Sequence, residues 1–298
     1  MLIMMNVIDT HVHVWDLEHY RLPWLDGEGP VLKRTWAPSD YAADQATDHG
    51  YHVEQAVYVE VDMAPEERSR ENELACQMVS NPDCIYGGAC ISGDMTTPEF
   101  EAYITEWGAK PQIKGVRQVL HVPSAKPGTC LEPQFLANVR RLGELGLVFE
   151  GCLRCPELGD LVTVAKECPE TTIVLNHMGI VDADIMGTTS PSDDELAYQE
   201  AWKRNMAQLG RLSNVVCKVS GLNPMKPWTT EGLARSVDVA LDAFDADKVV
   251  FASNYPVLNI AMTFDEWMCA MLKIAEGLDA TDRTALFAEN ARRVYGLK

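Results

Sequence analysis

Short apolar, β-branched runs alternate with longer amphipathic runs along the whole of this 298-residue sequence. The short runs have the composition of buried strands, and the longer runs repeat their apolar residues at helical spacing. Eight strand–helix pairs in one chain of this length predict a (β/α)8 barrel, or TIM barrel. No linker, repeat or low-complexity tract interrupts the pattern, so we expect residues 1–298 to form one barrel domain with an extra helix at the C-terminus.

The strands are expected at 7–15, 53–62, 84–92, 113–121, 146–154, 171–179, 214–222 and 248–257. The clearest helical patterns cover 65–80, 97–109, 132–146, 193–212, 229–244, 264–278 and 280–297. Several of them begin with a Ser, Thr or Asp cap or with an early Pro. Two segments without periodicity, 16–37 and 180–192, follow strands, so we expect them on the carboxyl face of the barrel, with the first as part of a lid.

The composition excludes several classes of partner. Lys and Arg number 25 against 44 Asp and Glu, which gives a formal charge of −19 and argues against nucleic acid and anionic membranes as partners. No apolar run reaches the roughly 18 residues of a membrane span, and the first residues do not have the pattern of a signal peptide. The nine scattered cysteines indicate reduced thiols. We therefore expect a cytoplasmic protein that acts on a small molecule, and a homo-oligomer stays open.

Two histidines stand one residue apart in VIDTHVHVWD, residues 7–16. On a strand, His11 and His13 would share one face, roughly 6–7 Å apart along the chain. Together they could bind a metal ion or a polar substrate. The alternative is a pair of exposed polar residues that alternate with Val12 and Val14 on a half-buried strand.

Other polar residues fall where the expected strands end. In a barrel of this kind, polar side chains at the carboxyl ends of strands form the functional site. A buried ring of charges costs free energy unless its members pair or perform chemistry. Ion pairs within the ring, such as Arg117 or Lys218 with Glu60 or Glu150, are the structural alternative. The members are His11, His13, Glu60 (with Tyr58 and Asp62 on the same side of its strand), Arg117, His121, Glu150, Cys152, Arg154, His177, Lys218, Ser220 and Asn254.

The motifs DTHVH, GVRQVLH, LNHMG, CKVSGL, SNYP and LFAENARRVYGL occur in this order at those positions. With them the chain resembles the amidohydrolase superfamily, and more narrowly the amidohydrolase-related family of metal-dependent TIM-barrel hydrolases that includes L-fuconolactonases and L-rhamnono-lactonases. The resemblance covers essentially the whole chain. It implies that His11, His13 and His177 bind one divalent metal ion, for which zinc suits neutral imidazole best, or bind the substrate in a metal-free site.

One departure from the family pattern concerns residue 254. The family usually has Asp there, which ligates the metal and takes a proton from the attacking water, whereas this chain has Asn254. An amide is a poor metal ligand and no base, so metal binding should be weaker or absent. If water attacks, the base must be another residue: Glu60 is the first candidate, with His177 or His121 next.

The resemblance implies a hydrolase, with a lactonase of sugar acids as the expected activity. Water would attack the ring carbonyl, and Arg117, Lys218 or a metal would stabilise the oxyanion. We expect Arg117, His121, Arg154 and Lys218 to bind the substrate. The alternatives are a metal-dependent decarboxylase of the same superfamily and a barrel that binds sugar acids without catalysis.

Overall fold

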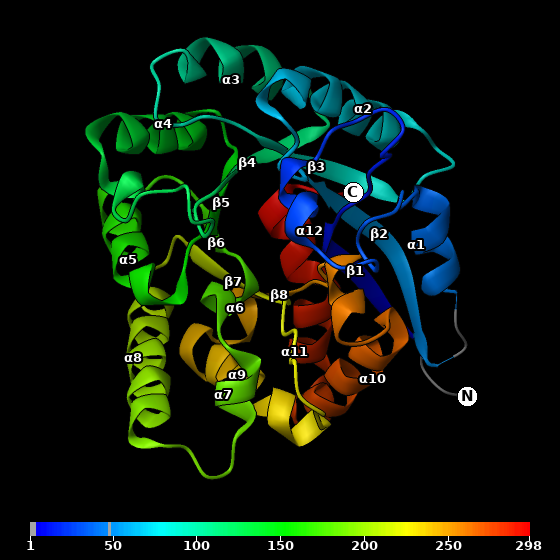
Figure 1. The fold of residues 1–298 in the computed structure, drawn as a ribbon, viewed down its shortest axis with the longest axis vertical. Coiled ribbons are helices and arrows are strands. Elements are labelled where there is room, and N and C mark those ends of the chain that lie inside the picture. Colours follow the sequence, from blue (N-terminus) through cyan, green and yellow to red (C-terminus); the bar gives the residue numbers. More distant parts are fainter. Residues whose placement is uncertain (1–3, 47–48) are drawn as a thin grey trace.

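The computed structural model describes residues 4–46 and 49–298. Residues 1–3 and 47–48 lie outside this description. Eight strands form one sheet in the order β1 to β8, and each strand runs parallel to the next. Helices surround them, which confirms the predicted (β/α)8 barrel (Figure 1). The strands are β1 (Met5–Val12), β2 (Tyr51–Val59), β3 (Tyr86–Ser92), β4 (Ile113–Val119), β5 (Val148–Cys152), β6 (Ile173–Leu175), β7 (Val215–Val219) and β8 (Val249–Phe251).

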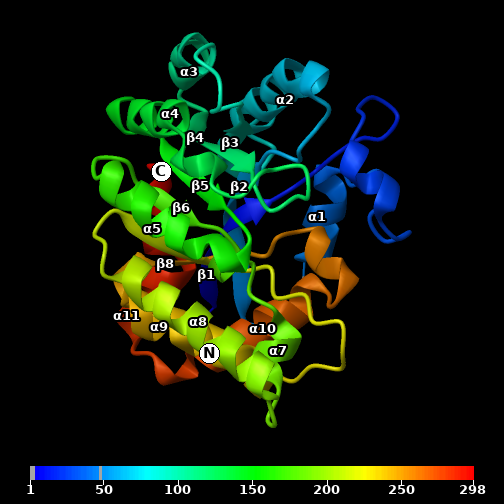
Figure 2. The same ribbon diagram turned by 60° about the vertical axis from the view of Figure 1, so that its left-hand side comes forward.

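Helices cover the outside of the strands, with α2 to α4 on one side and α8 to α11 on the other (Figure 2). The α-helices are α1 (Pro38–Asp44), α2 (Arg68–Ser80), α3 (Phe100–Gly108), α4 (Pro133–Glu144), α5 (Leu158–Glu167), α6 (His177–Ile180), α7 (Ala183–Gly187), α8 (Asp193–Gly210), α9 (Thr230–Phe244), α10 (Phe264–Ile274), α11 (Ala280–Thr284) and α12 (Asn290–Tyr295). Short 3-10 segments lie at Pro23–Gly27, Pro65–Glu67, Thr129–Leu131, Cys155–Glu157, Ala246–Lys248, Val257–Ile260 and Ala275–Gly277, and a π-helical turn at Ala285–Glu289. No helix in this described part is long and apolar enough to cross a bilayer.

The ends of several helices follow from local sequence. The side chains of Ser192, Thr229 and Thr263 each accept a hydrogen bond from the backbone amide three residues further on, in the first turn of α8, α9 and α10. Such caps satisfy amide groups that have no partner within the helix. The sequence therefore predicted where these helices begin to within one residue.

Several strands are shorter than the sequence predicts, and the difference falls at their carboxyl ends. Residues 171–179 were expected as one strand, but β6 ends at Leu175 and His177 lies in a turn with positive φ. Likewise β1 ends at Val12, before His13, and β2 ends at Val59, before Glu60. At these points the chain leaves the sheet, and the side chains of the polar residues that follow turn into the mouth of the barrel.

The barrel closes where β1 meets the segment after β8. The amide of Asn254 donates to the carbonyl of His11 at 3.0 Å, and the amide of His13 donates to the carbonyl of Tyr255 at 2.7 Å. Val12 and Tyr255 form a parallel bridge at the same level. Closure therefore brings the predicted histidine pair and Asn254 side by side, although 241 residues separate Asn254 from His13.

The interior of the barrel is filled by small and β-branched side chains from the strands, which pack against Tyr295 of the C-terminal helix α12. Tyr295 is buried, and its hydroxyl donates to Oε1 of Glu150 at 2.6 Å. The extra C-terminal helix that the sequence predicts thus contributes to the barrel core. The strand residues of this cluster are Val57, Val59, Cys90, Val148, Val174, Val216 and Val250.

The fully buried carboxylate of Asp9 ties the closure together. Its Oδ1 accepts from the amides of Ser253 (2.8 Å) and His11 (3.2 Å), and its Oδ2 accepts from the Tyr41 hydroxyl (2.8 Å). Replacing Asp9 by Asn removes the negative charge that these three donors share and turns one oxygen into an NH2 group, so the Tyr41 hydroxyl would have to accept and its own buried proton would lose its partner. We expect Asp9→Asn to lower the free energy of unfolding by about 2–4 kcal/mol, and Tyr41→Phe, which removes one bond, by about 1–2 kcal/mol. Urea denaturation measures both, and equal stability of Asp9→Asn and the wild type would contradict this role.

Candidate active site

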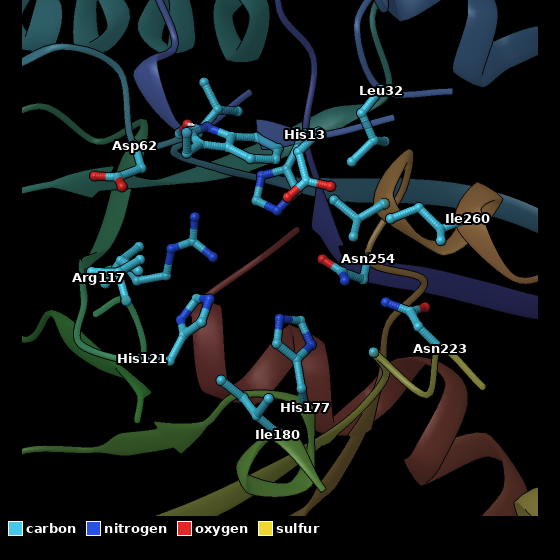
Figure 3. A pocket seen from close by; sticks show the side chains of 17 residues that line it. His13, Leu32, Asp62, Arg117, His121, His177, Ile180, Asn223, Asn254 and Ile260 are labelled. Atoms are coloured by element: carbon cyan, nitrogen blue, oxygen red, sulfur yellow. Dashed lines mark hydrogen bonds between the residues drawn. The ribbon is translucent and has the colours of Figure 1, made fainter. Parts of the chain in front are cut away.

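A cavity of about 310 Å³ opens at the carboxyl ends of the strands. Figure 3 shows how its side chains face one another: the guanidinium of Arg117 and the imidazole of His121 lie on one side, the carboxamides of Asn223 and Asn254 on the other, and the imidazoles of His13 and His177 lie above and below in this view. The segment 16–37 contributes Trp24, Glu28 and Leu32 to the wall, the position that the sequence predicts for it. Its polar lining includes His13, Asp62, Arg117, His121, His177, Asn223 and Asn254, and its apolar lining includes Val61, Val119, Val122, Ile180, Val257 and Ile260.

The histidine pair points in one direction, as the i, i+2 spacing predicts. The Nε2 atoms of His11 and His13 lie 3.0 Å apart, and the rings meet edge to face. His13 lines the cavity, and its Nδ1 donates to the carbonyl of Val59 at 2.8 Å. Burial, followed by the charge of Arg117, lowers the pKa of His13 to about 3, and burial together with Lys218 lowers that of His11 well below its usual value. Both rings are therefore neutral near pH 7.

The spacing of the pair meets part of the requirement for a metal. Two nitrogens bound to one tetrahedral zinc ion at about 2.0–2.1 Å lie ~3.3 Å apart, close to the observed distance. The ring of His177 packs against His11 with centroids 4.5 Å apart. Its nitrogens do not complete a triad, however. Within the described ranges, groups of three His, Cys, Asp or Glu with ligand atoms all within 4.8 Å occur at the surface only, at His49–Asp265–Cys269 and Asp16–Glu18–His19.

Two further features oppose a chelated cation. Residue 254 offers an amide in place of a carboxylate, and Nη1 of Arg117 lies 3.4 Å from Nε2 of His11. A divalent ion between the two imidazoles would therefore meet a guanidinium and lack an anionic ligand. The residues present fit a divalent metal poorly, which differs from the three-histidine ligand set expected from the sequence.

Arg117 and Glu60 form a buried ion pair at the cavity wall. Nε of Arg117 donates to Oε1 of Glu60, and Nη2 donates to the Glu60 carbonyl at 2.6 Å. The other carboxylate oxygen of Glu60 accepts from the amide of Asp62 at 2.7 Å. Both oxygens of Glu60 are thus engaged, so Glu60, the first candidate for a base, instead holds Arg117. The guanidinium faces the cavity from this anchored position (Figure 3).

Lys218 lies below the cavity and does not line it. The side chain is fully buried between strands, and its Nζ is 3.0 and 2.8 Å from the two oxygens of Glu150. Glu150 also accepts from the side chain of Asn176 and from Tyr295. This position differs from the expectation that Lys218 binds substrate, because the closed network leaves no access from the cavity.

Of the other two residues expected to bind substrate, His121 lines the cavity and Arg154 does not. Arg154 pairs with Glu157 at 2.7 Å and donates to the carbonyls of Val122 and Ala125, so it holds the loop after β4 and is absent from the cavity lining. His121 does line the cavity, with Nδ1 3.3 Å from Sγ of Cys152. Burial, then Arg117 and Arg154, lower the pKa of His121 to about 4. The position of His121 therefore fits the expected role in substrate binding, whereas the position of Arg154 does not.

His177 is presented by a left-handed turn. The four residues of α6, His177 to Ile180, have φ values of 53°, 50°, 78° and 52°. Left-handed backbone costs about 1–2 kcal/mol for each residue other than Gly, so the surrounding structure must hold the turn. The indole of Trp202 does so by donating to the carbonyl of Met178 at 2.8 Å. The turn aims the imidazole into the cavity while Nδ1 lies 2.8 Å from Oγ of Ser220.

Asn254 lies beside His13 and across the cavity from Arg117 (Figure 3). Its φ is 63°, a conformation that Asn and Asp adopt more readily than other side chains. Next to Asn254 is Asn223, which the candidate residues from the sequence did not include (Figure 3). Asp62, expected on the same side of its strand as Glu60 but without an assigned role, also lines the cavity. Burial and the neighbouring Glu60 raise the pKa of Asp62 to about 6, and it lines both this cavity and a second one of about 460 Å³. Asn223 follows the carboxyl end of β7, and this position is the signal by which sequence analysis could have found it.

Comparison with known proteins shows the family and the fold of the chain. The profile of the amidohydrolase family matches residues 8–297, so the chain belongs to that family. It is 27% identical to an L-fucono-1,5-lactonase of Burkholderia multivorans over 97% of this chain and 96% of the other. It is similar to the structure of amidohydrolase 2 from Bifidobacterium longum subsp. infantis (31% identity, TM-score 0.74, 99% and 100% coverage). A zinc-bound amidohydrolase structure from Burkholderia multivorans shares the fold (24% identity, TM-score 0.83, 98% and 100% coverage).

Gly221, after β7, allows His177 to occupy its place. A Cβ at Gly221 would lie 2.7 Å from both Cγ and Nδ1 of His177, and the φ of +68° disfavours any other residue. We expect Gly221→Ala to displace the imidazole, break its contact with Ser220 and lower the free energy of unfolding by about 1–3 kcal/mol. A crystal structure and urea denaturation of the variant measure the two effects.

Gly159 in α5 offers the matched control, because a Cβ there meets nothing within 4 Å. Gly159→Ala should leave His177 unmoved and stabilise the protein by about 0.5–1 kcal/mol through helix propensity. An unchanged His177 in Gly221→Ala would show that the ring does not depend on this glycine.

Proposed function

We propose that this protein is a lactonase that opens the lactone of a small hydroxylated acid by attack of water on the ring carbonyl. The observation that carries the proposal is the anchored guanidinium of Arg117, which faces neutral imidazoles across a cavity of small-molecule size. The similarity to an L-fucono-1,5-lactonase supports a sugar acid as the substrate. We place the enzyme in the cytoplasm.

Arg117 would stabilise the oxyanion. Its Nε and Nη2 are committed to Glu60, so the remaining Nη1 can donate to a carbonyl oxygen in the cavity without the side chain reorganising. A fixed positive charge aimed at developing negative charge lowers the barrier most when water is excluded. The apolar wall formed by residues such as Trp24, Leu32 and Ile260 provides that exclusion.

His177 would take the proton of the attacking water. Burial, then Arg117 and Lys218, hold its pKa well below the usual value, so it is unprotonated near pH 7. When Nδ1 donates to Ser220, Nε2 keeps its lone pair for the water. The proton then passes to the ring oxygen as the carbon–oxygen bond breaks, which yields the open hydroxy acid. His121 is the second candidate for this step.

We propose that these steps run on the side chains alone, because the donor set around the histidine pair fits a divalent ion poorly. The same feature weighs against the alternative reaction, metal-dependent decarboxylation. A barrel that binds sugar acids without catalysis is distinguished by turnover. A panel of sugar-acid 1,4- and 1,5-lactones, followed by acid release at near-neutral pH, tests the proposal, and no turnover of any lactone would contradict it.

Arg117→Lys separates the catalytic role of the guanidinium from its structural one. Lysine keeps a positive charge beside the buried Glu60 but cannot pair with it and also reach the cavity. We expect kcat/KM for the best lactone to fall about 100-fold or more, mostly through kcat. Arg154→Lys, which alters an arginine outside the cavity, is the control and should change kcat/KM less than fivefold. Equal losses in the two variants would contradict the role of Arg117.

Asn254→Asp tests whether Asn254 is a lost base or an adapted residue. We expect no gain in lactone hydrolysis and no stoichiometric zinc binding, because a carboxylate alone does not remove the cation from beside His11. Hydrolysis rates and metal content are measured for both proteins side by side. A joint rise in zinc content and turnover would show that this site is a weakened metal enzyme.

A further inference from the structure

We propose that the second cavity is a subsite for a neutral polyhydroxyl group, so that the substrate is a sugar-acid lactone that carries a glycosyl substituent; this rests on the lactonase function proposed above and names its substrate class. We call the second cavity the glycosyl subsite. Among the side chains that line it are Asp62, Arg68, Ser92, Asp94, Gln118 and Lys126.

The glycosyl subsite lies on the functional face of the barrel. It has a volume of about 460 Å³ and is lined by residues at the carboxyl ends of β2, β3 and β4. In barrels of this kind the groups that contact the substrate lie at these ends. Its outer wall is the loop after β4, which Arg154 holds by donating to the carbonyls of Val122 and Ala125. Arg154 thereby shapes the subsite without lining the first cavity.

The two cavities share a wall. Asp62, Arg117, Val119 and Val122 line both of them. A lactone ring whose carbonyl oxygen faces Arg117 in the first cavity therefore lies next to the glycosyl subsite. A substituent on that ring can extend past these side chains into the second space.

Asp62 and Arg68 both line the glycosyl subsite without pairing with each other. Burial, then Glu60, raise the pKa of Asp62 to about 6, while Arg117 and Arg68 lower it, so the charges of Arg68 and Asp62 act on each other. Among the residues that the structure describes, neither side chain has a hydrogen-bond or ion-pair partner. A carboxylate and a guanidinium that interact across a gap can hold hydroxyl groups between them, because a hydroxyl donates to the first and accepts from the second.

The position of Arg68 does not serve the stability of its helix. It is the first residue of α2, where the positive end of the helix dipole disfavours a cation. Two neighbouring arginines, Arg21 and Arg70, each pair with a carboxylate, Glu66 and Glu67. The half-buried Arg68 has no such partner, so its donors are free for a ligand.

The lining favours a neutral ligand over an ion, because charges of both signs surround the space. A carboxylate in the subsite would face Asp62, and an amine would face Arg68, whereas hydroxyl groups can satisfy both. None of the described residues that line it is aromatic, so it offers no stacking surface to a flat apolar ring. Apart from the paired Arg117 and Glu60, the charged side chains of the lining are Arg68, Lys126, Asp62, Asp94 and Glu132.

Binding of the product acids tests the subsite without requiring turnover. Isothermal titration calorimetry compares gluconate with its glycosylated derivatives lactobionate, maltobionate, cellobionate and melibionate. We expect at least one derivative to bind the wild type about fivefold or more tightly than gluconate, since added hydrogen bonds to charged groups have effects of this size. A smaller preference for every derivative would overturn the proposal.

Arg68→Met removes the free guanidinium from the subsite. Arg70→Met is the matched control, because it removes the same charge from the same helix outside the subsite. We expect Arg68→Met to abolish the preference for the glycosylated acid and to leave the affinity for gluconate unchanged, while Arg70→Met alters neither. A preference that survives Arg68→Met, or that both variants reduce equally, would contradict the role of Arg68.

Turnover separates this proposal from the lactonase activity itself. The lactones of the same acids are assayed by acid release. We expect the glycosylated lactone to have the higher kcat/KM, mostly through a lower KM, and Arg68→Met to remove this advantage. If no lactone is turned over but a glycosylated acid binds more tightly through Arg68, the lactonase proposal fails and the subsite stands. Hydrolysis of the simple lactone with no preference for a glycosylated form would mean the reverse.

Discussion

The buried ion pair between Lys218 and Glu150 is the interaction on which the rest of the barrel mouth depends. Moving two charges out of water is costly, so such a pair persists only when further hydrogen bonds complete it. Tyr295 from the C-terminal helix, Asn176 after β6 and the carbonyl of Thr10 on β1 supply these bonds. The pair thereby connects both ends of the chain to the centre of the sheet and sets the floor of the cavity.

A second buried pair, Glu60 with Arg117, forms the wall above this floor. Each pair is locally neutral, but both cations lie beside the ring of His11: Nη1 of Arg117 is 3.4 Å from its Nε2, and Nζ of Lys218 is 3.4 Å from its Nδ1. Burial, and after it the charges of Arg117 and Lys218, lower the pKa values of His11, His13 and His177. The site therefore combines fixed positive charge with neutral nitrogen acceptors, which suits an electrophilic carbonyl and an attacking water better than it suits a metal cation.

The backbone around the cavity is bent where the strands end. Asp62, His177 and Asn254 line the cavity, and each has a positive φ within a few residues of the end of its strand. These conformations cost free energy that the packed barrel below must supply. Strained positions at the carboxyl ends of strands are a means of aiming side chains inward once the sheet no longer directs them. Short strands such as β6 are a consequence of the same turn.

The sequence by itself determined the eight strand–helix units, the main helix starts and the set of polar residues at the strand ends. These features are local: periodicity, caps and strand alternation act over a few residues. Only the tertiary structure decided what each polar residue does. Glu60 and Arg117 are 57 residues apart and Glu150 and Lys218 are 68 apart, so their pairing, and the burial of Lys218, has no local signature.

The left-handed turn at His177 also has no signal in the sequence, because Met178 and Ile180 rarely adopt this conformation and packing against Trp202 and Gly221 makes it stable. Strand order brings residues to one end of the barrel, but the choice between a metal ligand, a base and an ion-pair partner depends on distances of a few tenths of an ångström between segments far apart in the chain.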